Sequence, residues 1–158
     1  MLELGRHGRL PAASRTLPLT GDLQYDTNPN TLELNGIATA GKHRLITVQS
    51  RNGKLFLVNG RTGSTREIDL GGDSVVNGDG LLLRGRTLYV VQNRDNKIAV
   101  VHLKRGLRQG EIKRFLTEPE FDVPTTLASR GGFLWTVNAR FTTPSTPTTT
   151  YDVVRVSR

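Results

Sequence analysis

The chain has 158 residues and no cysteine, which excludes disulfides, thiolate metal sites and cysteine nucleophiles. Its hydrophobic fraction is only 35%, and no apolar run reaches the roughly 18–20 residues that a membrane-spanning helix needs, so we expect no membrane partner. Seventeen glycines and seven prolines indicate many turns, and the net charge is +8.

The N-terminal part of the chain divides into two segments. Residues 1–15 are basic and lack hydrophobic periodicity, so we expect a disordered tail. They also lack the apolar core of a signal peptide. Residues 16–25 resemble a short strand, which we interpret as the outer strand of a sheet that precedes the repeats described next.

Three segments of the chain repeat one pattern, an apolar strand that ends in an amide side chain. They span residues 45–50, 88–93 and 134–139, and their matching valines are Val48, Val91 and Val137. The spacings of 43 and 46 residues are typical of four-stranded β-propeller blades.

Shorter strands flank each repeated segment. The strands before it span 35–38, 79–82 and 124–127, and we expect Asn35-Gly36 and Asp79-Gly80 to open the first two as turns. The strands after it span 54–58, 97–101 and 151–156, and fourth strands at 65–70 and 111–116 complete two repeats. Residues 142–150 are of low complexity and predict a long loop.

These strands predict an all-β fold, a partial β-propeller of about three blades, which is half of a six-bladed ring. The blades are four-stranded and antiparallel and span about 34–70, 77–116 and 123–158, and the last one lacks its fourth strand. Residues 16–25 would then be the outer strand of a preceding blade.

At these residues the chain resembles the six-bladed propellers of the senescence-marker-protein (regucalcin) and gluconolactonase-like group. The resemblance lies in Asn35-Gly36-Ile37-Ala38, in Asp79-Gly80-Leu81 and in the strand that ends Val-Gln-Asn at Asn93. Residues 76–93 look most like secreted bacterial members of this group. The resemblance covers residues 17–158, about the C-terminal half of such a ring, and it implies an extracellular location for a longer parent protein.

The resemblance also implies a divalent metal at the ring centre and the hydrolysis of lactones. Asn35 and Asp79 match the positions of two oxygen ligands, and Asp79 would also be the catalytic base. The third ligand, a Glu, belongs to an earlier blade. Calcium is the metal expected first, with zinc or magnesium as alternatives, because hard oxygen ligands suit such cations. Asn77, in a neighbouring Asn-Gly pair, is an alternative ligand to Asp79.

Each of these residues also has a simpler explanation. Asn-Gly and Asp-Gly form turns in many proteins without binding anything. The third blade opens with Pro124-Thr125, where the pattern calls for an acid or an amide, and this weakens the case for a central site. Histidines are few and dispersed, so no zinc-binding pattern is present.

Gln49, Gln92 and Asn138 occupy the same position at the ends of the three repeated strands. They are candidates for residues that face a small-molecule ligand in the central channel. The alternative is that their amides satisfy backbone groups between blades. Trp135 lies in the third repeated strand, and we expect it to pack in the core.

The basic residues are scattered along the sequence, and the one small cluster, Lys104-Arg105 with Arg108, lies in a glycine-containing turn. No aromatic residues alternate with them, as binding of single-stranded nucleic acid would require. We therefore interpret them as a solvated surface with a general preference for anionic ligands and expect no nucleic-acid partner.

Three functions remain open from the sequence. The chain is a remnant of a metal-dependent lactone hydrolase, a binding or scaffold propeller without catalysis, or a truncated fragment. In the last case two copies would pair through their open, apolar blade faces as a homodimer and complete a ring. Residues 16–25 of one copy could then complete the last blade of the other.

Overall fold

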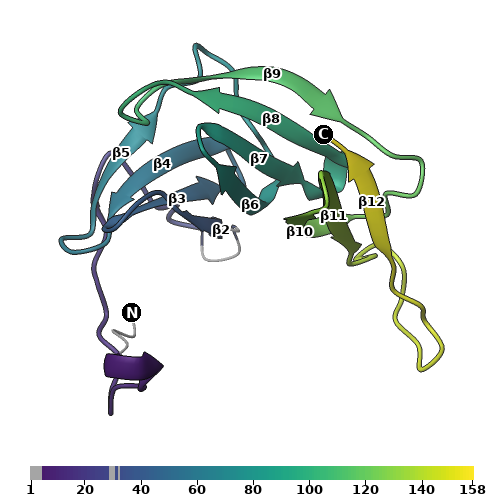
Figure 1. Cartoon of the computed structure of the whole chain (residues 1–158), viewed down its shortest axis with the longest axis horizontal. Helices are drawn as coiled ribbons and strands as arrows, with labels where there is room; N and C mark the ends of the chain where they lie inside the picture. The colour runs from purple at the N-terminus through teal and green to yellow at the C-terminus, as the bar shows by residue number, and fades with distance from the viewer. Residues whose placement is uncertain (1–4, 29–30, 32) are drawn as a thin grey trace.

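The computed structural model describes residues 5–28, 31 and 33–158. Over these residues the chain forms twelve β-strands and two single turns of 3-10 helix, and no α-helix. The strands form three sheets that follow one another in chain order. Figure 1 shows the sheets arranged along an open arc. The predicted all-β class is therefore confirmed.

The first sheet has five strands in the order β1-β5-β4-β3-β2. These are β1 (Thr20–Gly21), β2 (Leu34–Thr39), β3 (Arg44–Gln49), β4 (Lys54–Asn59) and β5 (Ser64–Ile68). Strands β2 to β5 form an antiparallel meander, whereas β1 pairs with β5 in parallel.

The second and third sheets have four and three strands, all antiparallel. The second contains β6 (Gly78–Arg84), β7 (Thr87–Gln92), β8 (Lys97–Leu103) and β9 (Gly110–Leu116). The third contains β10 (Pro124–Arg130), β11 (Phe133–Asn138) and β12 (Val153–Ser157). The 3-10 turns are η1 (Arg6–Gly8) and η2 (Asn93–Asp95). As predicted, the last sheet has no fourth strand within the described residues.

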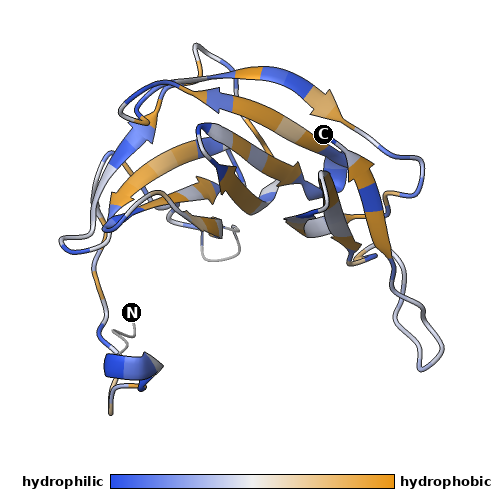
Figure 2. Cartoon of the chain, viewed as in Figure 1, coloured by the Kyte–Doolittle hydropathy of each residue, from blue (hydrophilic) through white to orange (hydrophobic). Residues whose placement is uncertain are grey.

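The sheets stack face to face, so the middle sheet is buried on both sides. Val90 and Leu88 pack in a cluster with residues of the first sheet, whereas Val91 and Tyr89 pack with residues of the third. Successive residues of a strand point to opposite faces, and for this reason β7 and β8 are apolar along most of their length. Figure 2 shows these strands as largely hydrophobic, while the outer strand β9 carries a hydrophilic stretch.

Strands β2, β6 and β10, one from each sheet, lie side by side on the concave side of the arc (Figure 1). Each is the first strand of its antiparallel meander, so the three occupy equivalent positions in the repeat. Any residues that these strands present on the concave side are therefore candidates for a shared site.

Residues 16–25 do not lie in a separate sheet. Thr20 and Gly21 pair with Ser64 and Thr65 of β5, at the outer edge of the first sheet. The chain then crosses the outer face of that sheet, because Leu23 N–H donates to Thr65 Oγ1 at 3.0 Å and Gln24 C=O accepts from Gln49 Nε2 at 2.9 Å. The expected outer strand of a preceding blade is thus an edge strand and cover of the first sheet.

Residues 16–25 cover the outer face of the first sheet, whereas nothing comparable in the described chain covers the outer face of the third. On the first sheet, Phe56 is only 1% exposed although it points away from the second sheet. On the third sheet, the outward face is uncovered: Trp135 is 37% exposed, Val137 38% and Val153 59%. The sequence expectation that Trp135 packs in the core is wrong, since it lies on this outer face and donates through Nε1 to Arg130 C=O.

Residues 5–15 of the expected disordered tail are largely exposed and contain only the turn η1, whereas residues 1–4 lie outside the described residues. None of the helical turns in the described chain is long and apolar enough to cross a membrane.

Candidate functional site

A β-bulge interrupts each of the three concave strands at the same place. The register of β2 shifts between Leu34 and Ile37, and that of β6 shifts between Gly78 and Leu81. In β10 the shift falls between Pro124 and Thr126. The bulged residues include Asn35, Asp79 and Thr125, which we call the inner-strand row. Bulges commonly redirect side chains at functional sites.

Two glycines allow the three bulged strands to pack closely against one another. A Cβ on Gly36 would lie 1.9 Å from the carbonyl oxygen of Asp79, and a Cβ on Gly80 would lie 2.5 Å from that of Thr125. Neither glycine has a positive φ angle. Asn35-Gly36 and Asp79-Gly80 therefore lie inside strands rather than in the predicted turns, and glycine is needed because two backbones approach closely.

Asp79 is the one carboxylate of the inner-strand row, and it is half-buried. Its Oδ2 accepts a hydrogen bond of 2.9 Å from Asn93 Nδ2, and no cation forms an ion pair with it among the described residues. Burial raises the pKa of the Asp79 carboxyl above its usual value of 3.8, while the hydrogen bond from Asn93 acts in the opposite direction. Its other oxygen retains full acceptor capacity.

Asn35 and Thr125 flank Asp79 on the neighbouring strands, and both are partly buried. Within the described part of the chain, neither the Asn35 amide nor the Thr125 hydroxyl has a hydrogen-bond partner. The row therefore offers a carboxylate, an amide and a hydroxyl with unused hydrogen-bonding capacity. Thr125 stands where the repeat pattern called for an acid or an amide.

Asn77, the alternative ligand, does not join this row. Its φ angle of 61° places it in the left-handed region, and its Nδ2 donates to Asp95 Oδ1 at 2.8 Å. Asp95 in turn forms an ion pair with Lys97 at 3.1 Å. The Asn77 amide thus supports the β7–β8 turn.

The three strand-end amides are buried, with Gln49, Gln92 and Asn138 between 1% and 3% exposed. Each donates its side-chain N–H to a backbone carbonyl of the segment that leads into the first strand of its own meander. The acceptors are Gln24, Val76 and Glu120. This is the alternative that the sequence left open, amides that satisfy backbone groups.

Gln92 is the least satisfied of the three. Its Nε2 donates to Val76 C=O at 2.7 Å and to Asp95 Oδ2 at 3.2 Å, but its buried Oε1 has no hydrogen-bond partner in the described structure. By contrast, Asn138 Oδ1 accepts from the Asp122 N–H at 3.0 Å.

The described residues do not fit the metal that the resemblance implies. No group of three His, Cys, Asp or Glu side chains within them could hold a metal ion. The inner-strand row supplies one carboxylate and two neutral oxygens, whereas calcium takes six to eight oxygen ligands. The row therefore does not supply the ligand set of a calcium ion.

Asn93 is the site residue that the sequence reasoning missed. It is 8% exposed and follows Gln92 in the repeat, as Ser50 follows Gln49. The Ser50 hydroxyl donates to Gly78 C=O, next to Asp79. The sequence does contain a signal for it. In the first two repeats a polar residue, Ser50 or Asn93, directly follows the strand-end amide, and this is the end of the sheet at which the bulges lie.

Comparisons with known proteins do not assign this chain to a family. The chain matches no known protein-family model and no curated protein. Among solved structures it is similar to the computationally designed Ika4 protein, with a TM-score of 0.44 and 9% sequence identity. That alignment covers 92% of this chain and 99% of the designed one. The fold class, the sheet topology and the geometry of the site are therefore taken from the structure of this chain alone.

Proposed function

We propose that the chain is three blades of a β-propeller similar to the senescence-marker-protein and gluconolactonase group, and that it binds a neutral, hydroxyl-rich small molecule. The ligand would lie on the concave side, against the inner-strand row of Asn35, Asp79 and Thr125. Three consecutive antiparallel sheets, with equivalent bulged strands side by side, support the blade assignment.

The half-buried Asp79 carboxylate carries this proposal. It has one hydrogen-bond donor and no counter-charge among the described residues, and burial penalises its charged form. A ligand hydroxyl that donates to its free oxygen would compensate part of that penalty. The Asn35 amide and the Thr125 hydroxyl can each donate and accept, which suits a polyhydroxylated molecule.

Binding is measured best with a stable, uncharged mimic of a sugar lactone, such as gluconolactam, by titration calorimetry. We expect wild-type protein to bind it, and Asp79→Asn to weaken binding by about tenfold, because a charge-assisted hydrogen bond becomes a neutral one. The matched control is Asp73→Asn, an exposed carboxylate in the connection from β5 to β6. Equal binding by all three proteins would overturn the proposal. Parallel titrations with calcium, zinc and magnesium test the metal that the resemblance implies.

Lactone hydrolysis is a second candidate function, and the raised pKa of Asp79 favours it. A carboxylate with a raised pKa is a better general base, and Asp79 could accept a proton from a water molecule that attacks the lactone carbonyl. The test compares the rate of lactone opening by wild-type protein and by Asp79→Asn, after subtraction of the spontaneous rate. Equal rates would exclude this function and leave the binding proposal intact.

Self-association is a separate proposal, since the uncovered face of the third sheet exposes apolar side chains around Arg155, the cross-strand partner of Trp135. Trp135, Val137 and Val153 are exposed there, and such faces commonly mark interaction sites. The other end of the stack is covered by residues 18–24, so a ring that closes through both ends would require this segment to move. We therefore propose a two-fold dimer in which the third sheets of two copies face each other.

A further inference from the structure

The loops at one end of the sheets are rich in basic residues, and the loops at the other end are rich in acidic residues. In an antiparallel meander, alternate connections lie at opposite ends of the sheet. One end holds the connections β2–β3, β4–β5, β6–β7, β8–β9 and β10–β11. With the residues that flank them, these connections contain no Asp or Glu. Their basic residues are Lys42, Arg44, Arg61, Arg84, Arg86, Lys104, Arg105, Arg108 and Arg130. We call this the basic end.

The opposite end is mainly acidic. Its connections are β3–β4, β5–β6, β7–β8, β9–β10 and β11–β12, and their acidic residues include Asp73, Asp95, Glu118, Glu120, Asp122 and Asp152. Asp69 also belongs to the β5–β6 connection, but its backbone bonds Arg108 and Gly110 at the basic end. With the flanking residues counted as at the basic end, the basic residues of this opposite end are Arg51, Lys54, Arg94, Lys97 and Arg140. A sequence in which the arginines look scattered thus folds into a molecule with two oppositely charged ends.

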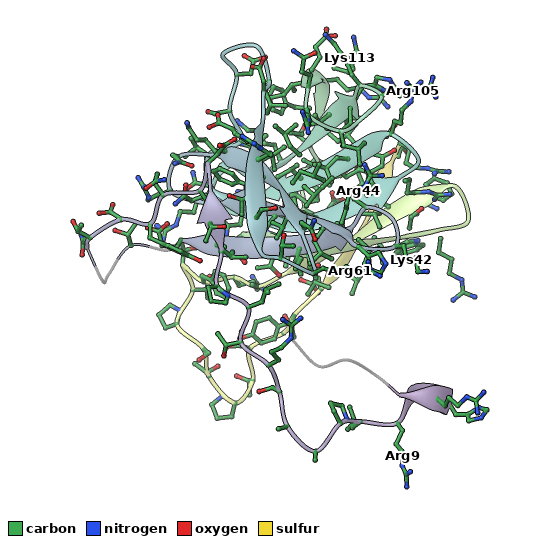
Figure 3. The ribbon with its side chains drawn as sticks, turned by 90° about the vertical axis from the view of Figure 1, so that its left-hand side faces the viewer. Arg9, Lys42, Arg44, Arg61, Arg105 and Lys113 are labelled. Carbon is green, nitrogen blue, oxygen red and sulfur yellow. The ribbon has the colours of Figure 1, made fainter. Side chains whose placement is uncertain are left out.

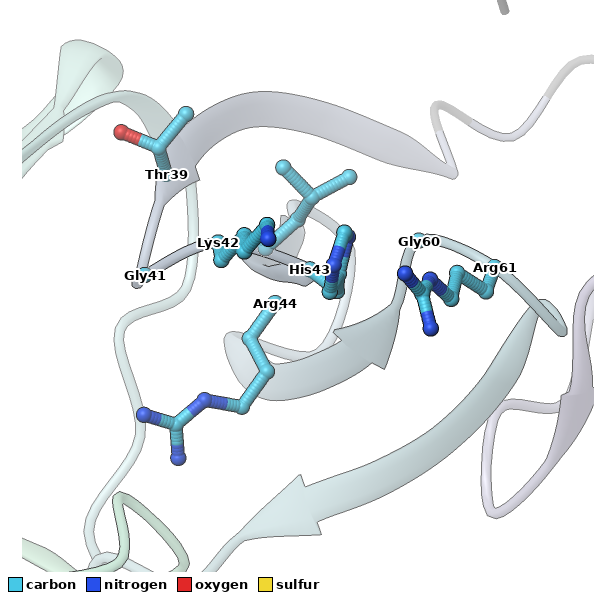
Figure 4. A pocket seen from close by; sticks show the side chains of 8 residues that line it. Thr39, Gly41, Lys42, His43, Arg44, Gly60 and Arg61 are labelled. Atoms are coloured by element: carbon cyan, nitrogen blue, oxygen red, sulfur yellow. The ribbon is translucent and has the colours of Figure 1, made fainter.

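Two adjoining grooves hollow the basic end. One, of about 410 Å³, is lined by Lys42, His43, Arg44 and Arg61, among others (Figure 4). The second, of about 460 Å³, lies between the first two sheets and is lined by Arg44, Arg86 and Arg105. Arg44 belongs to both grooves. Figure 3 shows Lys42, Arg44, Arg61 and Arg105 on the same side of the molecule.

These groove cations are not neutralised by the protein. Lys42, Arg44, Arg61, Arg86 and Arg105 are all exposed, and none forms an ion pair within the described part of the chain. Two arginines at the acidic end differ, since Arg51 pairs with Glu33 at 3.2 Å and Arg140 with Asp122 at 2.8 Å. Near the β8–β9 connection, Glu111 pairs with Lys113 and is also influenced by Lys104, which lies outside both grooves. Asp69 bonds this connection through its backbone and forms no ion pair among the described residues.

We propose that these grooves bind a multiply charged oxyanion, a molecule that carries two or more phosphate or sulfate groups. Guanidinium groups bind such groups through paired, charge-assisted hydrogen bonds. Several cations that converge without a counter-charge suit several negative charges on one ligand. No Phe, Tyr or Trp side chain lines either groove, so His43 is the one ring there on which a nucleic-acid base could stack.

The test uses tripolyphosphate as the probe, with binding followed by calorimetry at low salt. We expect the double variant Arg44→Gln/Arg105→Gln to weaken binding by about tenfold or more, because two charge-assisted contacts are lost. The matched control is Arg94→Gln/Arg114→Gln, which removes the same charge from exposed positions outside the grooves. It should weaken binding by no more than about twofold, through long-range electrostatics alone.

A second arm distinguishes a free oxyanion from one carried on a polymer. A sulfated polysaccharide and duplex DNA are titrated against the same three proteins. If the polymers bind and only the groove variant weakens that binding, the proposal is supported, and the oxyanion groups are those carried on the polymer. Equal weakening by the groove and control variants would overturn it in favour of a diffuse cationic surface. Failure of every probe to bind would also overturn it.

Discussion

The backbone of Gly36 lies against the carbonyl oxygen of Asp79, so closely that a Cβ on Gly36 would be 1.9 Å from that oxygen. This approach joins the bulge of β2 to the bulge of β6. It brings strands β2 and β6 close together on the concave side. The same relationship recurs between Gly80 and Thr125.

Replacement of Gly36 by alanine should therefore destabilise the protein. The added methyl group would meet backbone rather than a flexible side chain, so the two sheets must move apart. We expect the free energy of unfolding to fall by about 1–3 kcal/mol, as for overpacked cores. Urea denaturation measures this loss. Gly60→Ala is the matched control, because its nearest neighbour, His43 C=O, would lie 3.5 Å from the new Cβ. A similar loss in both variants would contradict this account of Gly36.

Asn138 is expected to be important for stability rather than for binding. Its buried amide bonds the backbone at Glu120 and Asp122. Asn138→Ala would leave both groups without partners, so we expect a loss of about 2–4 kcal/mol in the free energy of unfolding. Asn59→Ala serves as the control, because the exposed Asn59 side chain accepts from Arg61 N–H at 2.9 Å and water can replace it. If both substitutions have the same small effect, burial of the Asn138 amide contributes little.

The raised pKa of Asp79 predicts a specific pH dependence of stability. Well below pH 3.8 the carboxyl is protonated in both the folded and the unfolded chain. As the pH rises, the unfolded chain loses the proton first, so wild-type stability falls until the folded carboxyl also ionises. Asp79→Asn lacks this loss, and its stability relative to wild type should increase from acidic to neutral pH. Chemical denaturation across this range measures the difference. A constant difference would contradict the burial of the Asp79 charge.

Much of the fold could be predicted from the sequence, because the repeat has a strong period. The core strands around Val48, Val91 and Val137 are found as β3, β7 and β11. Strand alternation is a local signal, and it was sufficient to place the flanking strands, although Asn35-Gly36 and Asp79-Gly80 lie inside strands and not in the predicted turns.

What the sequence could not predict depends on contacts between distant residues. The role of Gly36 depends on the backbone of Asp79, which lies on another strand. The exposure of Trp135 depends on which sheet face stays uncovered, and the cover provided by Leu23 depends on a path across the first sheet. The convergence of Arg44, Arg86 and Arg105 likewise comes from the stacking of two sheets.

Association through the third sheet gives another prediction. We expect wild-type protein to be a dimer by light scattering at micromolar concentration and Trp135→Arg to be a monomer, because a second positive charge would be buried beside Arg155 in the contact. Phe115→Arg is the control, since Phe115 is 48% exposed on the outer strand β9, away from this face. A monomeric wild type, or dissociation of the dimer by both variants, would contradict the proposed interface.

The most direct test of the proposed function is a titration of isotope-labelled protein with gluconolactam, followed by backbone amide chemical shifts. The proposal predicts saturable shift changes at the bulges around Asn35, Asp79 and Thr125, which Asp79→Asn should largely abolish. Saturable changes centred on the basic end around Arg44, or no saturable changes at all, would contradict a ligand site on the inner strands.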